Sequence, residues 1–195
     1  MNNNVLKINN LNFEYTKNRL IYNNFSLSLN KGEIISIVGQ SGSGKSTLFE
    51  LITNNLKAKS GDIKVSTVSS VYQDPYTSFH PTYCILEQIK DVVSDISSLE
   101  ELCQSLDLDT QLLNKKPHEL SGGQLQRCSI LRALLSKADL ILADEPTSAL
   151  DNVIALNVMQ LLLKHKDKFG MLLITHDEDL ALWCSDKIIR LEENK

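Results

Sequence analysis

The sequence predicts an α/β protein with a largely parallel sheet, a small N-terminal antiparallel β subdomain and an all-helical insertion. Three observations support this fold class. Apolar, strand-like runs alternate with helical sequence in both the first and the last part of the chain, as in sheets whose parallel strands are joined by helices. Residues 76–136 have apolar positions at helical spacing and no strand-like run. Near the start, a short run alternates between apolar and polar residues, as a half-buried strand does.

The N-terminal part contains several predicted strands and one predicted helix. Its first two strands are expected to form a hairpin that adds the small antiparallel sheet. Ser60 to Asp62 is expected to be a turn, because glycine there lies between polar residues. The predicted strands are Val5 to Tyr15, Phe25 to Leu29, Glu33 to Val38 and Val68 to Tyr72, and the helix runs from about Ser46 to Leu56.

Strand and helix alternate again after the helical block, which indicates further parallel strands. We expect one domain over residues 1–195, in which 1–75 and 137–195 form the core with its β subdomain, and 76–136 form a helical subdomain. The predicted strands of this last part are Leu140 to Ala143, Met171 to Thr175 and Lys187 to Leu191, and the helices are Val153 to Leu163 and Glu178 to Cys184.

Composition excludes several classes of protein. The 20 basic and 24 acidic residues give a net charge of −4, which argues against a chain that coats nucleic acid. No apolar run has the length needed to span a bilayer, and the first residues do not resemble a secretory signal. The four cysteines form no Cys-x-x-Cys pair and suggest no zinc site. We therefore expect a soluble, cytosolic protein that reaches a membrane only by docking.

Residues 39–47 match a phosphate-binding loop at every position, after an apolar strand and before helical sequence. Glycines let the backbone wrap closely round a pyrophosphate, and amide N–H groups at the helix N-terminus face the anion. Lys45 would reach the β and γ phosphates, and the Ser46 hydroxyl would bind Mg²⁺. The loop reads Gly39-Gln40-Ser41-Gly42-Ser43-Gly44-Lys45-Ser46-Thr47.

Two carboxylates, Asp144 and Glu145, directly follow the apolar run Leu140 to Ala143. The carboxyl ends of parallel strands meet at one edge of a sheet, so this pair is expected beside the phosphate-binding loop. Asp144 can hold Mg²⁺ through water, and Glu145 can polarise a water for in-line attack on the γ-phosphate. Together the two motifs predict a P-loop nucleotide triphosphatase with a RecA-like core.

A second candidate anion site lies at Leu120 to Gln124. Small residues with free amides and a serine hydroxyl precede the apolar helix Ile130 to Leu135. A chain with two such sites needs either two phosphates or a partner chain whose bound phosphate is contacted by the second site. The residues of this site are Ser121, Gly122, Gly123 and Gln124.

The order of these motifs resembles that of the ATP-binding cassette (ABC) family over essentially the whole chain. In this resemblance, Gly39 to Thr47 is Walker A and Leu120 to Gln124 is the LSGGQ motif. The other corresponding positions are Tyr15 for the aromatic that stacks on adenine, Gln73 for the Q-loop glutamine, Asp144 and Glu145 for Walker B with its catalytic glutamate, Ser148 to Asp151 for the D-loop, and His176 for the switch histidine.

The resemblance implies that two cassettes dimerise head to tail and enclose two ATP molecules. Each ATP would lie between Walker A of one chain and LSGGQ of the other, which is either a second copy or a paralogous chain. The γ-phosphate would be contacted by Lys45 and His176, and ATP and Mg²⁺ would be the cofactors. The implied metal ligands are Ser46, Gln73 and, through water, Asp144, and the implied catalytic residues are Glu145, His176 and Lys45.

A finer resemblance lies in Gln73 to Pro81, which is similar to the Gln-Asp-Pro stretch of the peptide/nickel importer subfamily. It implies uptake of peptides, nickel or metal chelates, with transmembrane permease subunits and an extracytoplasmic substrate-binding protein as partners. The segment after Gln73 and the helical block would accept a cytoplasmic helix of the permease. The cassette would then lie on the cytoplasmic side of the cell membrane.

Two other functions stay open at this point. An exporter of lipid, drug or lipoprotein shares every catalytic motif with an importer. A soluble ABC ATPase acting on DNA or ribosomes is less favoured, because the chain has one cassette, a short helical block and a negative charge. We expect no bound nucleic acid, and no C-terminal regulatory domain after the last predicted strand.

Overall fold

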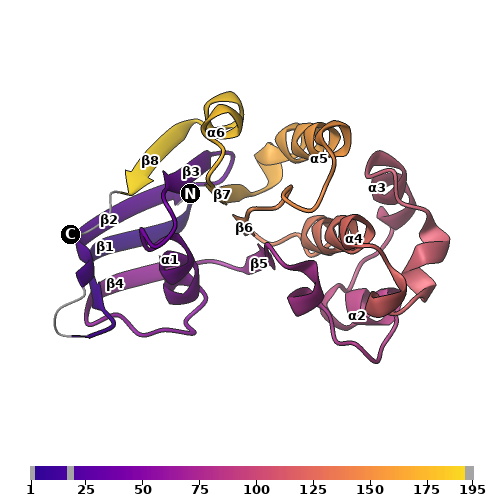
Figure 1. The fold of residues 1–195 in the computed structure, drawn as a ribbon, viewed down its shortest axis with the longest axis horizontal. Helices are drawn as coiled ribbons and strands as arrows, with labels where there is room; N and C mark the ends of the chain where they lie inside the picture. Colours follow the sequence, from indigo (N-terminus) through magenta and orange to yellow (C-terminus); the bar gives the residue numbers. More distant parts are fainter. Residues whose placement is uncertain (1–2, 17–19, 192–195) are drawn as a thin grey trace. The chain divides into compact units, whose positions relative to one another are not determined.

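The computed structural model describes residues 3–16 and 20–191, which form two compact units (Figure 1). The first unit consists of the described parts of Met1–Val68, Asp139–Asp144 and Lys166–Lys195. The second consists of Ser69–Ala138 and Glu145–His165. The chain therefore passes between the units several times, once at the peptide bond between Asp144 and Glu145.

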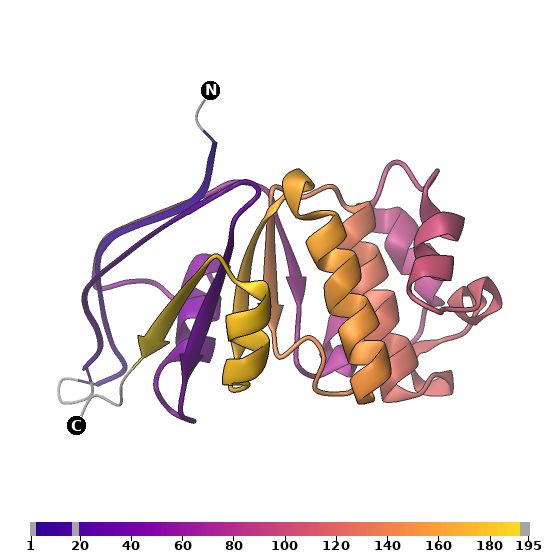
Figure 2. The same cartoon turned by 90° about the horizontal axis from the view of Figure 1, so that it is seen from above.

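The first unit contains a three-stranded antiparallel sheet in the order β2-β1-β4. Its strands are β1 (Asn4–Glu14), β2 (Leu20–Asn30) and β4 (Ser60–Val65). Alternating apolar side chains such as Leu6, Ile8 and Leu29 are buried, which is why these segments form strands with one covered face. The pairing of β1 with β2 is interrupted by register shifts, and both strands bend along their length (Figure 2).

The expectation of a turn at Ser60 to Asp62 is wrong, because these residues begin β4. Five of the six β4 residues are exposed, so the strand lacks the apolar alternation that marks the others. Its backbone pairs with β1, with Ile63 opposite Ile8. Gly61 has a φ of +98°, and a Cβ there would lie 2.6 Å from the carbonyl oxygen of Asn10, so this glycine permits a close approach of two strands.

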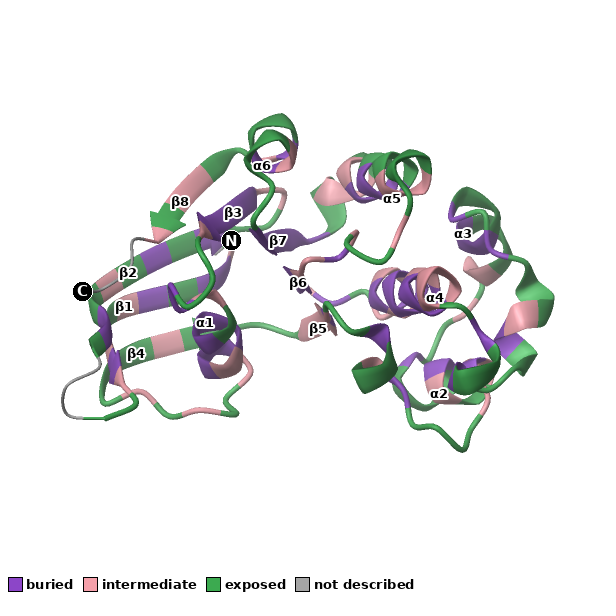
Figure 3. Ribbon diagram, viewed as in Figure 1, coloured by how far each residue is buried: buried purple, intermediate pink, exposed green. Residues whose placement is uncertain are grey.

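The first unit also contains parallel strands in the order β6-β7-β3-β8. They are β6 (Leu140–Asp144), β7 (Gly170–Thr175), β3 (Ile34–Gly39) and β8 (Lys187–Leu191). β7 is buried throughout and β3 as far as Val38 (Figure 3), as expected for parallel strands covered on both faces. The helix α1 (Lys45–Ile52) follows β3, and α6 (Glu178–Cys184) connects β7 to β8.

The second unit is mainly helical. β5 (Val68–Val71) leads the chain into it, and no other strand lies among its described residues. Its α-helices are α2 (Ile85–Val92), α3 (Leu99–Ser105), α4 (Gly122–Leu135) and α5 (Asn152–Lys164), and its short 3-10 helices are η1 (Pro75–Ser78), η2 (Thr110–Asn114) and η3 (Pro117–Glu119). A further 3-10 turn, η4 (Lys166–Lys168), belongs to the first unit. Of the helices described, none is long and apolar enough to cross a membrane.

Candidate functional site

Three predicted site residues lie at one edge of the parallel sheet in the first unit. Gly39 ends β3, Asp144 ends β6 and His176 directly follows β7. The register places Val38 opposite Thr175, and Asp144 opposite Ile174. Because all three strands run in the same direction, their carboxyl ends bring the phosphate-binding loop, a carboxylate and an imidazole to the same edge.

Glycine is required at two points of the phosphate-binding loop. Gly44 precedes α1 with a φ of +102°, and a Cβ there would lie 2.6 Å from the Ile21 side chain. At Gly39 an added Cβ would lie 2.7 Å from the carbonyl oxygen of Leu191. The loop is thus packed closely against neighbouring strands of the same unit, so larger residues would change its shape.

A buried tyrosine holds the end of this loop. The Tyr22 hydroxyl donates a hydrogen bond to the carbonyl oxygen of Gly44 at 2.8 Å. Burial, and secondarily the nearby Tyr15, raises the pKa of Tyr22 well above its usual range, so the hydroxyl keeps its proton and remains a donor. This contact was not predicted from the sequence, since it depends on which strand lies next to the loop.

Lys45 is the first residue of α1 and points back over the loop. Its ammonium donates hydrogen bonds to the carbonyl oxygens of Gly39 at 2.5 Å and Gln40 at 2.8 Å. Ser46 is exposed beside it. The start of α1 therefore presents a cation, a hydroxyl and helix N-terminal amides together, which is the chemistry that binds a phosphate chain.

Tyr15 lies next to the loop and is open to solvent. Its side chain is 52% exposed, whereas Phe13 and Tyr22, the other aromatic residues near it in the sequence, are buried. The Tyr15 hydroxyl hydrogen-bonds with the Thr47 hydroxyl at 3.0 Å, and its ring meets the Phe13 ring edge-on at 5.0 Å. Of these three aromatic residues, only Tyr15 offers an exposed ring to a flat ligand.

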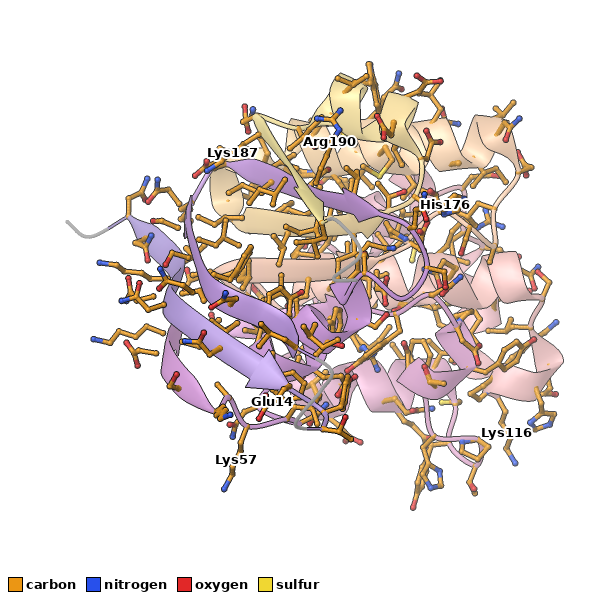
Figure 4. All side chains as sticks on the ribbon, turned by 60° about the vertical axis from the view of Figure 1, so that its left-hand side comes forward. Glu14, Lys57, Lys116, His176, Lys187 and Arg190 are labelled. Atoms are coloured by element: carbon orange, nitrogen blue, oxygen red, sulfur yellow. The ribbon has the colours of Figure 1, made fainter. Side chains whose placement is uncertain are left out.

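His176, labelled in Figure 4, is exposed between β7 and α6. The next residue, Asp177, caps α6 by accepting a hydrogen bond from the backbone N–H of Leu180 at 2.9 Å. The Asp177 backbone N–H donates to the Thr175 hydroxyl at 3.1 Å. These bonds on either side of His176 fix its backbone at the sheet edge.

Glu145 lies in a tight turn of the second unit with a φ of +47°, a left-handed conformation that is costly for a residue with a long side chain. Its carbonyl oxygen accepts hydrogen bonds from the Ser148 backbone N–H at 3.1 Å and the Ser148 hydroxyl at 3.0 Å. Further along, Asp151 caps α5 by accepting from the backbone N–H groups of Val153 and Ile154, both at 3.1 Å. The turn and the start of α5 are therefore held by local hydrogen bonds.

The second candidate anion site forms the N-terminus of α4. Ser121 and Gln124 make a capping box, in which the serine hydroxyl accepts from the Gln124 backbone N–H at 3.3 Å and the Gln124 side chain accepts from the Ser121 N–H at 3.0 Å. A Cβ at Gly123 would lie 3.3 Å from the carbonyl oxygen of Ala149, so this motif packs beside the turn that ends at Asp151.

Gln73 is exposed and directly precedes a segment attached to the same motif. Asp74 caps η1, accepting from the Tyr76 backbone N–H at 3.0 Å. The Tyr76 hydroxyl donates to the carbonyl oxygen of Leu120 at 3.1 Å. Within the second unit, the segment that follows Gln73 and the residue that precedes Ser121 are thus joined by a hydrogen bond.

Residues 22–148 match the family model described as ABC transporter. The chain belongs to the ABC transporter family. The predicted family and fold class are confirmed, and the cassette is an ABC transporter ATPase that binds ATP. Cassettes of this family dimerise and work with permease subunits. The prediction that the partners include a second cassette and permease subunits therefore holds.

Curated relatives resemble the cassette over nearly its whole length. It is 33% identical to the ergothioneine transport ATP-binding protein EgtV of Helicobacter pylori (strain G27), over 98% of this chain and 99% of the relative. It is 31% identical to the nickel import system ATP-binding protein NikE of Staphylococcus aureus (strain N315), over 97% of this chain and 87% of the relative.

Solved structures give the same family. The cassette is 30% identical, with a TM-score of 0.81, to an inward-facing metal-chelate type ABC transporter that is termed putative, over 97% of this chain and 79% of that chain. It is 29% identical, with a TM-score of 0.82, to the cassette MJ0796 in a dimeric post-hydrolysis state bound to ADP and Pi, over 98% of this chain and 97% of that chain.

We expect Gly44→Ala to weaken ATP binding by about tenfold or more, because the added methyl group collides with Ile21 and the left-handed backbone becomes strained by about 1–2 kcal/mol. The measurement is equilibrium binding of ATP. Gly32→Ala is the matched control, since Gly32 also has a left-handed φ of +83° but has no atom within 4 Å of its added Cβ. The control should lose stability and keep its ATP affinity. Equal ATP affinities of the two variants would contradict the packing role of Gly44.

Proposed function

We propose that the cassette hydrolyses ATP at the sheet edge formed by Gly39, Asp144 and His176, and thereby drives import of a small solute through permease subunits. The observation that carries the import direction is the resemblance, over 97% of this chain and 87% of the relative, to a protein named for nickel import. The Gln73 to Pro81 segment supports the same group by its resemblance to peptide/nickel importers. An exporter among the solved structures is 22% identical, and that likeness concerns the fold alone.

The transported solute belongs to a class of small, hydrophilic compounds. Nickel, metal chelates, peptides and ergothioneine are the candidates that the relatives and the sequence resemblance supply. We place the cassette on the cytoplasmic side of the cell membrane, bound to the permease through the segment after Gln73 and the helices of the second unit. An extracytoplasmic substrate-binding protein would deliver the solute.

Nucleotide binding is assigned to the loop of the first unit and the exposed tyrosine beside it. The Lys45 ammonium, which bonds to two loop carbonyls, is positioned to move onto the β and γ phosphates. The Tyr15 ring is exposed and its hydroxyl bonds to Thr47 at the start of α1, which supports stacking on adenine. The loop amides would bind the pyrophosphate.

The residue types that the family resemblance implies suit a magnesium ion. The Ser46 hydroxyl is exposed at the start of α1, Gln73 is exposed in its segment and Asp144 ends β6, and hydroxyl, amide and carboxylate oxygens are the ligands Mg²⁺ takes in nucleotide sites. When bound, the ion would neutralise charge on the β and γ phosphates. Ser46 and Gln73 would hold it directly and Asp144 through water.

Hydrolysis is assigned to Glu145, with His176 contacting the γ-phosphate. The Glu145 carboxylate follows Asp144 directly and would accept a hydrogen bond from the attacking water, orienting it for in-line attack. Phosphoryl transfer depends mainly on positioning and charge stabilisation, so a carboxylate held by a rigid turn suits this task. His176, at the end of β7, would donate to the γ-phosphate as charge develops on it.

The LSGGQ motif is assigned to a nucleotide bound by a second cassette. The capping box of Ser121 and Gln124 shapes the α4 N-terminus, whose amides and partial positive charge suit a phosphate. Gly122 has no atom within 4 Å of an added Cβ, so the backbone there is accessible to a partner. Asp151, at the start of α5, would lie in the same dimer interface. The second cassette is either another copy or a paralogue.

Glu145→Gln should bind ATP normally and lower turnover by on the order of 10² or more, because the amide keeps the size of the side chain and loses the charge that orients water. It should accumulate as an ATP-bound dimer.

Two further variants separate binding from hydrolysis. His176→Ala should likewise bind ATP and hydrolyse it slowly, whereas Lys45→Ala should fail to bind ATP. Nucleotide affinity, steady-state turnover and dimer fraction distinguish these cases. Near-normal turnover of Glu145→Gln would refute its assignment and favour a catalytic centre at His176.

Turnover per chain should rise with protein concentration, and Ser121→Tyr should abolish it while leaving ATP affinity nearly intact, because Ser121 serves the partner's nucleotide. The measurement is ATPase activity over a dilution series. Asp109→Ala is the control, since it also removes a helix-capping side chain, at η2, and costs about 1 kcal/mol without touching the motif. Turnover that is independent of dilution would exclude the shared site.

Deleting the gene should lower cellular uptake of one labelled solute among nickel, ergothioneine and a dipeptide. The wild-type chain should restore that uptake and Glu145→Gln should not, since import requires hydrolysis. The measurement is accumulation of each labelled solute in the deletion strain and its complemented derivatives. Unchanged uptake together with reduced release of a preloaded solute would contradict import and support export.

A further inference from the structure

A buried glutamine on α4, Gln126, connects two backbone segments of the second unit. It is 0% exposed. Its side-chain Nε2 donates a hydrogen bond to the carbonyl oxygen of Tyr72 at 3.2 Å and another to the carbonyl oxygen of Pro146 at 2.9 Å. Tyr72 directly precedes Gln73, and Pro146 directly follows Glu145. One amide group therefore holds the backbone beside both of these site residues.

Packing alone does not account for a glutamine at this position. Its neighbours along α4 include the fully buried Leu125, Ile130 and Leu131, so an apolar side chain of similar size would suit the surroundings. Within the described part of the chain, the Gln126 Oε1 atom is buried without a hydrogen-bond partner, which is unfavourable. The two donated hydrogen bonds are what the amide supplies and an apolar side chain could not.

The turn at Glu145 needs such support. A left-handed backbone at a glutamate persists only where surrounding contacts determine it. Ser148 donates hydrogen bonds to the Glu145 carbonyl from within the turn. Gln126, on α4, donates a hydrogen bond to the next carbonyl, that of Pro146. The backbone of the Glu145 turn is therefore held in part by α4.

The segment after Gln73 is attached to the same helix at further points. Arg132 donates from Nη1 to the carbonyl oxygen of Ser78 at 2.7 Å, and its guanidinium lies over the Phe79 ring, 4.3 Å from the ring centroid. With the bond from Tyr76 to Leu120, residues 72–79 are held along the length of α4. A displacement of this segment would be passed to α4 and so to the Glu145 turn.

We infer that Gln126 is a positioning residue for hydrolysis, which holds the Glu145 turn and makes its orientation depend on α4 and residues 72–79. The inference rests on the proposed role of Glu145 as the residue that orients water. It adds a physical link, one side-chain NH2 group that donates to two backbone carbonyls, between the segment that would contact the permease and the carboxylate that would promote hydrolysis. Gln126 itself touches neither nucleotide nor water in this role.

The first test is Gln126→Met, which keeps the side-chain volume and removes the donor. The maximal turnover rate should fall between about tenfold and a hundredfold, as expected for a misplaced catalytic group, and the ATP dissociation constant should change by less than about twofold. Ser129→Ala is the matched control, because the Ser129 hydroxyl is also buried on α4 and has no hydrogen-bond partner among the described residues. The control should keep full turnover.

A purely structural role gives a different pattern. In that case Gln126→Met would lose ATP binding, folded fraction and turnover together, and turnover per folded chain would be normal. That result would overturn the inference. If Gln126→Met does not fold, Gln126→Asn is used, since its shorter side chain keeps the amide and cannot reach both carbonyl oxygens. It should show the same selective loss of turnover rate, to a smaller extent.

The second test places Gln126→Met in the Glu145→Gln background. If Gln126 acts through Glu145, the double variant should have the residual turnover of Glu145→Gln within about twofold, because the group that it orients is already lost. Multiplicative losses would show independent action and overturn the inference. High turnover of Glu145→Gln alone would instead refute the proposed role of Glu145, so the two failures are distinguishable.

Discussion

The parallel pairing of β3, β7 and β6 is the constraint on which the nucleotide site of the first unit depends. Gly39, Asp144 and His176 are far apart in the sequence, and they share an edge only because three strands run in one direction and in register. A slip of one residue between two strands would displace an end by about 3.3 Å, more than a hydrogen-bond length. Burial of these strands therefore supports the geometry of the chemistry at their ends.

The parts of the structure that the sequence could predict are those with strong local signals. The buried strands β3, β6 and β7 are apolar runs, and α6 and β8 have the predicted bounds. β4 was missed because its side chains are exposed and its pairing uses the backbone. The contacts of Tyr22 with Gly44 and of Gln126 with Pro146 could not be predicted either, because they join residues that only the tertiary fold brings together.

Several motif residues also stabilise the helices on which they lie. Ser121 caps α4 and Asp151 caps α5, and serine and aspartate are among the most favourable residues at helix N-termini. Presenting backbone amides to an anion requires an intact helix start, so the structural and the proposed binding role need the same residue type. Sequence motifs of this kind therefore locate a site well. They do not separate the residue's contribution to helix stability from its contribution to ligand binding.

The left-handed backbone at Glu145 has a consequence for laboratory evolution of the cassette. Glycine, or asparagine to a lesser degree, would adopt this φ at lower cost than glutamate, so replacement would relieve local strain. A library selected only for heat resistance should consequently enrich such replacements at position 145, together with loss of the carboxylate. Selection for thermostability would have to be combined with selection for ATP turnover, because at this position the two demands favour different amino acids.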